Sequence, residues 1–396
     1  MAPQIETSTE TLEAIADRFA AAIATTAVER DHQGGTAKVE RDALRRTGLL
    51  NLLIPNFWGG HGASWPLIYR IVRRISRTDS SLGQLFGFQH LMLATIDLFG
   101  SQEQTENLYR RTVAGNWFWG NTLNPLDPGL SARWEGDTLV IDGRKRFSTG
   151  SSDADALIVS APDPTSDSNR LLVAAISLPR EGIVPLNDWN NMGQRQTDSG
   201  TVEFRSVRIH QAELLLSPGP FGSPRASLRP CIAQLVFANV YLGIAEGALQ
   251  EAKAYLQANP QAWWLSGVES KQQDPYVLRH FGQLFAALEA ARLVTDRAAD
   301  SLQRAWELGE NVSEAERGQV SVDIATAKVI TTQAGLDAVN RIFEVMGARA
   351  TTWPRRVDRF WRNLRTYTLH DPVDYKLREL GEWALADRHP RPTFYS

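Results

Sequence analysis

The sequence predicts a mainly α-helical fold with a small β domain in the middle of the chain. Three observations predict it. Apolar residues recur at helical spacing before residue 118, β-branched residues lie between glycine-containing turns from 119 to 210, and long alanine-rich helical patterns follow. We therefore expect an N-terminal helical domain at 1–118, a small β-barrel or β-sandwich domain at 119–215 and a C-terminal four-helix bundle at 216–396.

The first predicted helix is amphipathic. Its apolar positions are three or four residues apart: Leu12, Ile15, Phe19 and Ile23. Acidic residues fall where a signal peptide needs an uninterrupted apolar stretch: Glu6, Glu10, Glu13 and Asp17. We expect a helix here rather than a targeting segment, with further helices after it that are joined by breakers such as PNFWGGHGASWP at 55–66.

The β region is marked by turn signals and alternation. LSARWEGDTLVIDGRKRFSTG, at 130–150, has glycine-containing turn signals with β-branched residues between them. GTVEFRSVRI, at 200–209, alternates through Val202 and Phe204. The strands are therefore expected to end near 210.

Three long helical patterns with alanine-rich interiors follow, at 230–258, 275–308 and 313–347. The last begins with Ser313 and Glu316 at capping-box spacing. Together with a terminal helix they make an antiparallel bundle plausible. No long flexible linker separates the parts, so we expect them to pack as one body.

The most apolar stretch of the bundle is CIAQLVFANVYLGIAEGAL at 231–249. It is interrupted by Gln234, Asn239 and Glu246, which favours a buried helix over a membrane span. We therefore predict no membrane segment.

Composition excludes several kinds of partner. Lysine and arginine total 42 against 45 acidic residues, a net charge of -3, so no basic field would attract nucleic acid or acidic lipid. Cys231 is the only cysteine, which excludes an internal disulfide and fits a reducing cytoplasm. A small molecule is the expected partner.

Several common site types are also disfavoured. The histidines are never close enough to put two metal ligands on one helical face: His32, His61, His90, His210, His280, His370 and His389. GGHGAS at 59–64 lacks the lysine of a phosphate loop. Dinucleotide-binding glycine motifs and the serine hydrolase elbow are missing as well. We predict no metal site.

Polar and aromatic residues gather at the edges of the β region, in NWFWGNTLNP, RFSTGSSDAD and NDWNNMGQRQTDSG. Aromatic walls with amide and hydroxyl groups would suit a planar heteroaromatic cofactor. Alternatively, Trp117, Trp119 and Trp189 are core aromatics and the polar residues form turns, and residue content alone favours this interpretation.

One histidine stands out, in FWRNLRTYTLHDPVDYK at 360–376. His370 has Asp371 beside it and Tyr367 one helical turn earlier. It is either an acid/base group or a buried histidine with satisfied hydrogen bonds.

The order of these segments resembles the acyl-CoA dehydrogenase flavoprotein superfamily. LLNLLIPNFWGGHGA, DGRKRFSTG and MGQRQTDSGTVEFRSVRI resemble three of its motifs in the right order. Within it, the chain most resembles flavin-dependent monooxygenases of the dibenzothiophene monooxygenase type, through TAVERD, FGSQEQ, RQTDSG, AQLVFANVYLGIA, FEVMGAR, DRFWRN and LHDPVDYK.

The resemblance implies a two-component enzyme. Such monooxygenases take reduced FMN from a separate NAD(P)H-flavin reductase, form a C4a-hydroperoxyflavin with O2 and pass one oxygen atom to sulfur or nitrogen. It also implies a homotetramer. The alternatives are an FAD-dependent acyl-CoA dehydrogenase, in which Asp371 would be the base, and a catalytically inactive helical assembly protein.

The resemblance also implies roles for individual residues. His370, Asn121 and Thr149 match positions that stabilise the flavin peroxide, with His370 as proton donor and acceptor and Thr149 keeping a hydroxyl donor. Asn121, Thr149 and Trp189 would also contact the flavin, and Arg349 would reach the phosphate of a flavin in a neighbouring subunit.

The substrate pocket is expected to differ from that of the dibenzothiophene enzymes. Gln84, Phe88 and Tyr367 stand where those enzymes have a histidine, a tyrosine and a second histidine, and Trp119 would add an apolar wall. The changes leave oxygen activation plausible but put dibenzothiophene itself in doubt as the substrate.

Overall fold

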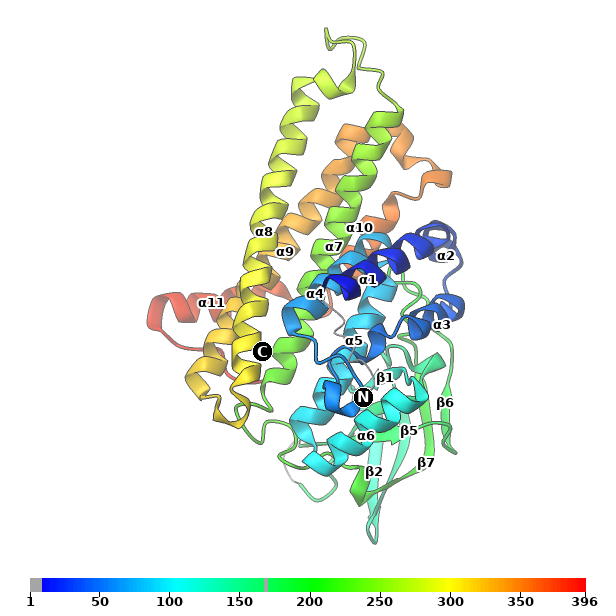
Figure 1. The fold of residues 1–396 in the computed structure, drawn as a ribbon, viewed down its shortest axis with the longest axis vertical. Coiled ribbons are helices and arrows are strands. Elements are labelled where there is room, and N and C mark those ends of the chain that lie inside the picture. Colours follow the sequence, from blue (N-terminus) through cyan, green and yellow to red (C-terminus); the bar gives the residue numbers. More distant parts are fainter. Residues whose placement is uncertain (1–8, 167–169) are drawn as a thin grey trace, which may run out of the picture.

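The computed structural model describes residues 9–166 and 170–396 and confirms the predicted order of helices, strands and helices (Figure 1). Helices precede the first strand, and the connection between the third and fourth contains two 3-10 helices, Leu49–Asn51 and Asn56–Trp58. The bounds of the α-helices are α1 Thr9–Ala24, α2 Ala27–Gln33, α3 Lys38–Arg46, α4 Trp65–Thr78, α5 Ser80–Phe99 and α6 Gln102–Gly115.

Helix α5 is the centre of this N-terminal layer because it is apolar on nearly all sides and almost entirely buried. Asp79 starts it, since its carboxylate accepts a hydrogen bond from the Leu82 backbone N–H at 3.0 Å. At Gly87 a Cβ atom would lie 2.5 Å from a methyl group of Val236 on α7. Glycine therefore lets α5 pack closely against the bundle.

The β domain is a sandwich of two sheets, which is one of the two forms predicted from the sequence, a β-barrel or a β-sandwich. Its strands are β1 Trp119–Thr122, β2 Leu130–Glu135, β3 Thr138–Lys145, β4 Ala156–Pro162, β5 Leu171–Ser177, β6 Ile183–Pro185 and β7 Val202–His210. One sheet has the order β1-β4-β5 and the other β2-β3-β7-β6. Only the β1–β4 pair is parallel among the paired strands described.

Strand β4 connects this domain to the rest of the molecule. Leu157 and Val159 point into the small core between the two sheets, whereas Ala156 and Ile158 belong to the main core with the helices. Because both faces of β4 are buried, its sequence is apolar at nearly every position instead of alternating between apolar and polar residues.

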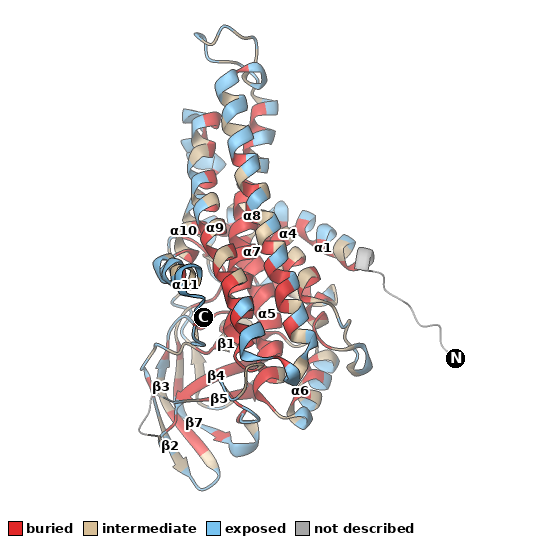
Figure 2. Ribbon diagram, turned by 90° about the vertical axis from the view of Figure 1, so that its left-hand side faces the viewer, coloured by how far each residue is buried: buried red, intermediate tan, exposed pale blue. Residues whose placement is uncertain are grey.

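Three long antiparallel helices and two shorter ones complete the fold. Their bounds are α7 Leu228–Ala258, α8 Pro275–Glu307, α9 Glu314–Met346, α10 Asp358–Tyr367 and α11 Val373–Ala386. Ser313 and Glu316 form the predicted capping box at the start of α9. Figure 2 shows buried residues concentrated where α4, α5 and α7 meet, with exposed residues towards the free ends of α8 and α9.

Helix α7 is the innermost element. It is the one described helix long and apolar enough to cross a membrane, but 83% of its apolar window is buried inside the protein. It packs against α4, α5, α8 and α9. The main core runs from α1 through β4 into the bundle, so the parts form one body, as predicted.

Candidate active site

A cavity of about 740 Å³ lies where the β domain meets α5, α7 and the turn between α10 and α11. Its size is typical of a site for a small molecule. Seven of the nine predicted site residues line it: Gln84, Phe88, Asn121, Thr149, Trp189, Tyr367 and His370. The fold therefore brings together groups that are up to 286 positions apart in the sequence (370 − 84).

The wall formed by the β domain carries a chain of hydroxyl groups. Thr149 Oγ1 lies 2.9 Å from Ser199 Oγ, which lies 2.8 Å from Thr197 Oγ1. Thr197 in turn donates to the Gln194 carbonyl at 3.1 Å. Asn121, on β1, donates its backbone N–H to the Thr149 carbonyl at 2.9 Å, which holds the two residues together.

The direction of this hydroxyl chain follows from its fixed end. Each hydroxyl has one hydrogen, and a carbonyl can only accept. Thr197 therefore donates to Gln194, Ser199 to Thr197, and Thr149 to Ser199. Thr149 consequently offers the cavity an acceptor, whereas the sequence comparison suggested a donor.

The helical part of the cavity lining includes His370, in the turn between α10 and α11. Its side chain is 42% exposed, so it is not a buried histidine with satisfied hydrogen bonds. His370 Nδ1 lies 3.0 Å from Asp371 Oδ1. Because a carboxylate only accepts, Nδ1 carries the hydrogen and Nε2 is left for the cavity.

Asp371 is held in turn by Lys328 of α9. Lys328 Nζ lies 2.5 Å from Asp371 Oδ1 and also donates to Gln234 Oε1 on α7. Lys328 is 1% exposed, and burial lowers its pKa to about 8 although Asp371 acts to raise it. The ammonium remains mostly protonated at neutral pH.

The pKa of Asp371 reflects the same arrangement. Burial alone would raise it, but the hydrogen bond from His370 and the charge of Lys328 outweigh burial. The pKa of Asp371 therefore lies well below its usual range. Asp371 is a permanent carboxylate that orients His370.

Aromatic side chains close this side of the cavity. The Phe237 ring lies 4.4 Å from His370, 5.2 Å from Tyr367 and 5.7 Å from Phe88, measured between ring centroids. Such spacing is typical of edge-to-face and tilted aromatic contacts. The imidazole is thus fixed by a carboxylate on one side and an apolar ring on the other.

Three buried polar atoms of lining residues have no hydrogen-bond partner within the described ranges: Gln84 Oε1, Gln194 Nε2 and Tyr367 Oη. Leaving such groups unsatisfied costs free energy. Because these three atoms are shielded from solvent, they lie behind the surface of the cavity rather than on it.

Trp189 lines the cavity from the loop before β7. Its indole N–H donates to the Gln194 carbonyl at 2.7 Å, and its ring contacts Phe147 edge-to-face. Phe147, Gln194 and Asp198 all have left-handed φ angles of 47–56°, which are uncommon for residues other than glycine. Backbone strain of this kind often accompanies a functional site.

Two predicted site residues do not line the cavity. Trp119 is 1% exposed, and its indole N–H donates to Thr112 Oγ1 at 3.0 Å, so it packs between α6 and β1 instead. The cavity of this structure therefore lacks Trp119 in its lining. Arg349 is exposed on a 3-10 helix at Ala348–Thr351, outside the cavity of its own chain.

Sequence reasoning missed several groups of the site. Ser199 and Thr197 lie in the quoted segment RQTDSG but gave no signal of their own. Lys328 and Arg229 are charged residues within helical patterns, where exposed positions are the usual expectation. Only the fold shows that both are buried.

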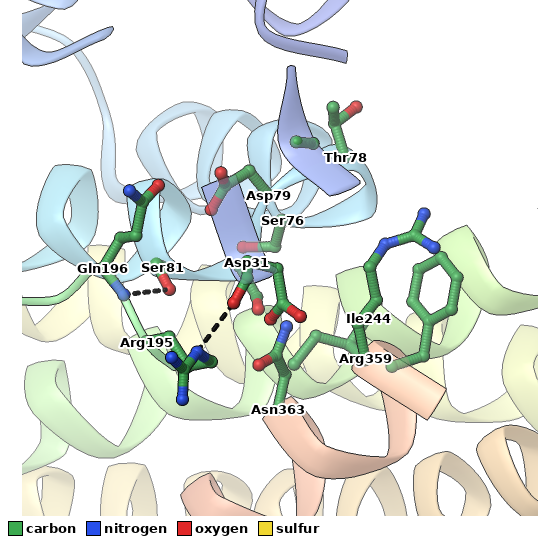
Figure 3. Close-up of a pocket in the computed structure, with 13 residues that line it drawn as sticks. Asp31, Ser76, Thr78, Asp79, Ser81, Arg195, Gln196, Ile244, Arg359 and Asn363 are labelled. Carbon is green, nitrogen blue, oxygen red and sulfur yellow. Dashed lines mark hydrogen bonds between the residues drawn. The ribbon is translucent and has the colours of Figure 1, made fainter. Parts of the chain in front are cut away.

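A second cavity, of about 20 Å³, lies between α2, the start of α5 and α10 (Figure 3). Arg195 donates from Nε to the Asp31 carbonyl at 2.7 Å, and the Gln196 backbone N–H donates to Ser81 Oγ at 3.4 Å. This space suits about one water molecule. Its contacts hold the loop that carries the hydroxyl chain.

Models of known families match most of the helical sequence. The model described as acyl-CoA dehydrogenase, N-terminal domain, matches residues 6–116, and that described as acyl-CoA dehydrogenase, C-terminal domain, matches residues 235–375.

Within the described residues, no group of three or more His, Cys, Asp or Glu side chains could hold a metal ion.

The chain is also similar to individual proteins along its length. It is 52% identical to the probable FMNH2-dependent monooxygenase SfnC of Pseudomonas putida, covering 97% of both chains. The structure of methanesulfinate monooxygenase MsuC from Pseudomonas fluorescens superposes with a TM-score of 0.95 at 52% identity, covering 97% of this chain and 99% of that one.

FMN-bound TdsC, a dibenzothiophene monooxygenase from a Paenibacillus species, gives a TM-score of 0.93 at 42% identity and covers 97% of this chain and all of that one. The two matched domain models and these similar proteins point to the same family. The chain belongs to the flavin-dependent monooxygenases with the acyl-CoA dehydrogenase fold, the family that includes dibenzothiophene monooxygenase.

Proposed function

We propose that this protein is a two-component monooxygenase that uses reduced FMN and O2 to oxygenate the sulfur atom of a small organosulfur compound. One observation carries the proposal: the same cavity is lined by a hydroxyl chain, by an amide and by a histidine whose orientation is fixed by a buried carboxylate. The relatives SfnC, MsuC and TdsC support both the cofactor and the sulfur substrate.

The residues present suit reduced flavin. A reduced isoalloxazine ring carries N–H donors, and the Thr149 hydroxyl is directed so that it accepts. Asn121 uses its Oδ1 for the Leu123 backbone N–H at 3.1 Å, which leaves its Nδ2 group as a donor. FMN is therefore our assignment and FAD the alternative.

Bound reduced FMN would supply the electrons that activate O2 and deliver one oxygen atom to the substrate. His370 would hold and pass on a proton at Nε2, the ring nitrogen that its contact with Asp371 leaves free. Asp371 keeps the other ring nitrogen protonated and the ring in place. Phe88, Trp189 and Phe237 exclude water from the reacting atoms.

The acyl-CoA dehydrogenase alternative fits the site poorly. It requires Asp371 to remove a proton from carbon. Lys328 and His370 both stabilise the ionised form of Asp371, and its lowered pKa makes it a weak base.

We propose two kinds of protein partner, a flavin reductase and further copies of this chain. A flavin reductase would deliver reduced FMN by diffusion. Exposed apolar side chains on and before α8 suit a homotetramer: Trp263, Trp264, Leu265, Tyr276 and Phe285. In such an assembly Arg349 would serve the phosphate of a flavin in a neighbouring subunit. A cytoplasmic location fits the single, buried cysteine Cys231.

Isotope labelling tests the proposed function. Chemically reduced FMN, ¹⁸O2 and a panel of organosulfur compounds are mixed with the protein, and products are analysed by mass spectrometry. We expect one ¹⁸O atom per product molecule. The proposal would be refuted if reduced FMN were oxidised to FMN with O2 released only as hydrogen peroxide, and no oxygenated product formed from sulfides, sulfones, sulfinates or thiophenes.

A further inference from the structure

One charged group on the cavity has no part in the proposed chemistry. Arg229, in the first turn of α7, lines the cavity and is 4% exposed. Its Nε donates to Thr95 Oγ1 at 2.9 Å, and this is the one hydrogen bond of its guanidinium within the described residues. The Thr95 hydroxyl donates to the Leu91 carbonyl at 2.7 Å, which leaves its oxygen free to accept from Arg229.

No carboxylate of the described chain neutralises Arg229. Burial lowers the pKa of Arg229 to about 10, and no charge of the described residues offsets this effect. Three other buried arginines pair with acids: Arg30 with Asp79, Arg41 with Asp198 and Arg73 with Asp296. Arg229 is therefore a buried cation whose two terminal nitrogen groups have no partner of opposite charge.

An unpaired buried cation costs several kcal/mol, and a bound anion would offset this. Guanidinium is suited to such an anion because its parallel N–H groups match two oxygen atoms of one oxyanion.

The position of Arg229 suits a substrate rather than a distant ion. Arg229, Ala233 and Phe237 recur every fourth residue, so they share one face of α7, and all three line the cavity. Phe237 contacts His370. The rise of the helix separates Arg229 from Phe237 by about 12 Å along the axis, with Ala233 midway. The space beside Ala233 thus lies between the cation and the histidine.

We propose that Arg229 determines substrate specificity by binding the oxyanion of an alkanesulfinate, which makes the preferred substrate anionic rather than a neutral thiophene or sulfone. The inference rests on the proposed function and names its substrate class. The sulfinate sulfur uses its lone pair to form one new S–O bond and is oxidised by two electrons. Overall, RSO2⁻, O2 and FMNH2 give RSO3⁻, H2O and FMN.

Arg229→Met tests this because it keeps the length of the side chain but removes its charge. With methanesulfinate we expect KM to rise roughly 10- to 100-fold, the range for a lost charge-assisted contact, while kcat changes little. Arg229→Lys should recover part of the loss. Arg110→Met, which removes an exposed arginine of α6, should match the wild type.

Direct binding gives a second readout that does not depend on turnover. In calorimetry with the flavin-free protein, methanesulfonate should bind the wild type and lose at least tenfold in affinity in Arg229→Met. Dimethyl sulfone, similar in shape but neutral, should be unaffected by the substitution.

Each contrary result has a distinct meaning. If Arg229→Met weakens FMN but not riboflavin, and leaves methanesulfinate unchanged, the guanidinium binds the flavin phosphate and the inference is wrong. If it weakens anionic and neutral ligands equally, the role is structural. Turnover of neutral sulfur compounds without methanesulfinate would overturn the inference alone, whereas failure with every sulfur compound would overturn the proposed function.

Discussion

Lys328 Nζ lies 2.5 Å from Asp371 Oδ1, in a buried ion pair that links α9 to the turn carrying His370. The pair is 43 residues apart in the sequence (371 − 328) and lies directly behind the imidazole that faces the cavity. The orientation of His370 therefore depends on a lysine that touches neither the cavity nor the histidine.

Lys328→Met should uncouple the reaction. The variant leaves Asp371 without its positive partner, so the carboxylate can no longer hold His370 in one position. We expect product per FMNH2 consumed to fall roughly tenfold, about 1.4 kcal/mol, with hydrogen peroxide rising to match and FMN affinity unchanged. Lys253→Met, at an exposed position of α7, is the control. If both variants form the same amount of product per FMNH2 consumed, Lys328 does not help to orient His370.

Asp371→Asn should reduce stability in a pH-dependent way. The folded pKa of Asp371 is lowered, so its stabilising contribution is fully present above the unfolded value of about 4 and is lost as the pH falls through the folded pKa. We expect a loss of about 3 kcal/mol in the free energy of unfolding at pH 7, since Lys328 is left unpaired.

The check is urea unfolding of both proteins between pH 7 and pH 3. The difference between wild type and Asp371→Asn should shrink below about pH 4. Asp300→Asn, an exposed carboxyl group on α8, should show no such trend. A constant difference across this range would mean that the ion pair is not the source of the stability.

Thr149→Val should weaken reduced FMN selectively. Valine keeps the shape of threonine but removes the acceptor that the hydroxyl chain directs into the cavity. We expect a loss of roughly fivefold in affinity for FMNH2, about 1 kcal/mol, with a smaller change for oxidised FMN. Anaerobic titrations with both forms measure this. Thr149→Ser keeps the hydroxyl group and should bind both flavin forms like the wild type. If Thr149→Val loses the same affinity for reduced and oxidised FMN, the Thr149 hydroxyl does not act as an acceptor for the reduced flavin.

Trp119→Phe should affect stability rather than turnover. The change removes the buried hydrogen bond to Thr112 but leaves the cavity lining intact. We expect a loss of about 1–3 kcal/mol in the free energy of unfolding and a KM within twofold of the wild type. Trp264→Phe, at an exposed position, controls for loss of an indole. A large change in KM in Trp119→Phe would instead indicate that Trp119 contacts the substrate.

Much of the fold could be predicted because its signals are local. The long helices appear at 228–258, 275–307 and 314–346, within two residues of the bounds expected from periodicity and capping. His370 and Asp371 could be paired because they are neighbours in the sequence.

The rest depends on tertiary contacts. Lys328 and Arg229 look like ordinary charged positions on helices, and only packing against α7, α9 and α5 buries them. The direction of Trp119 is a related case: the sequence identifies a large aromatic residue at the start of a strand but not which side of the strand its ring occupies. Likewise, the donor and acceptor roles of Thr149 are set by Ser199, fifty positions away (199 − 149).

The most direct test of the central claim compares wild type with His370→Ala. With reduced FMN, O2 and methanesulfinate or another accepted sulfur substrate, product per FMNH2 consumed is measured beside the affinity for FMN. The account predicts that product falls at least a hundredfold, as for loss of a general acid–base group, while FMN binding stays within about twofold. Unchanged turnover in His370→Ala would contradict it.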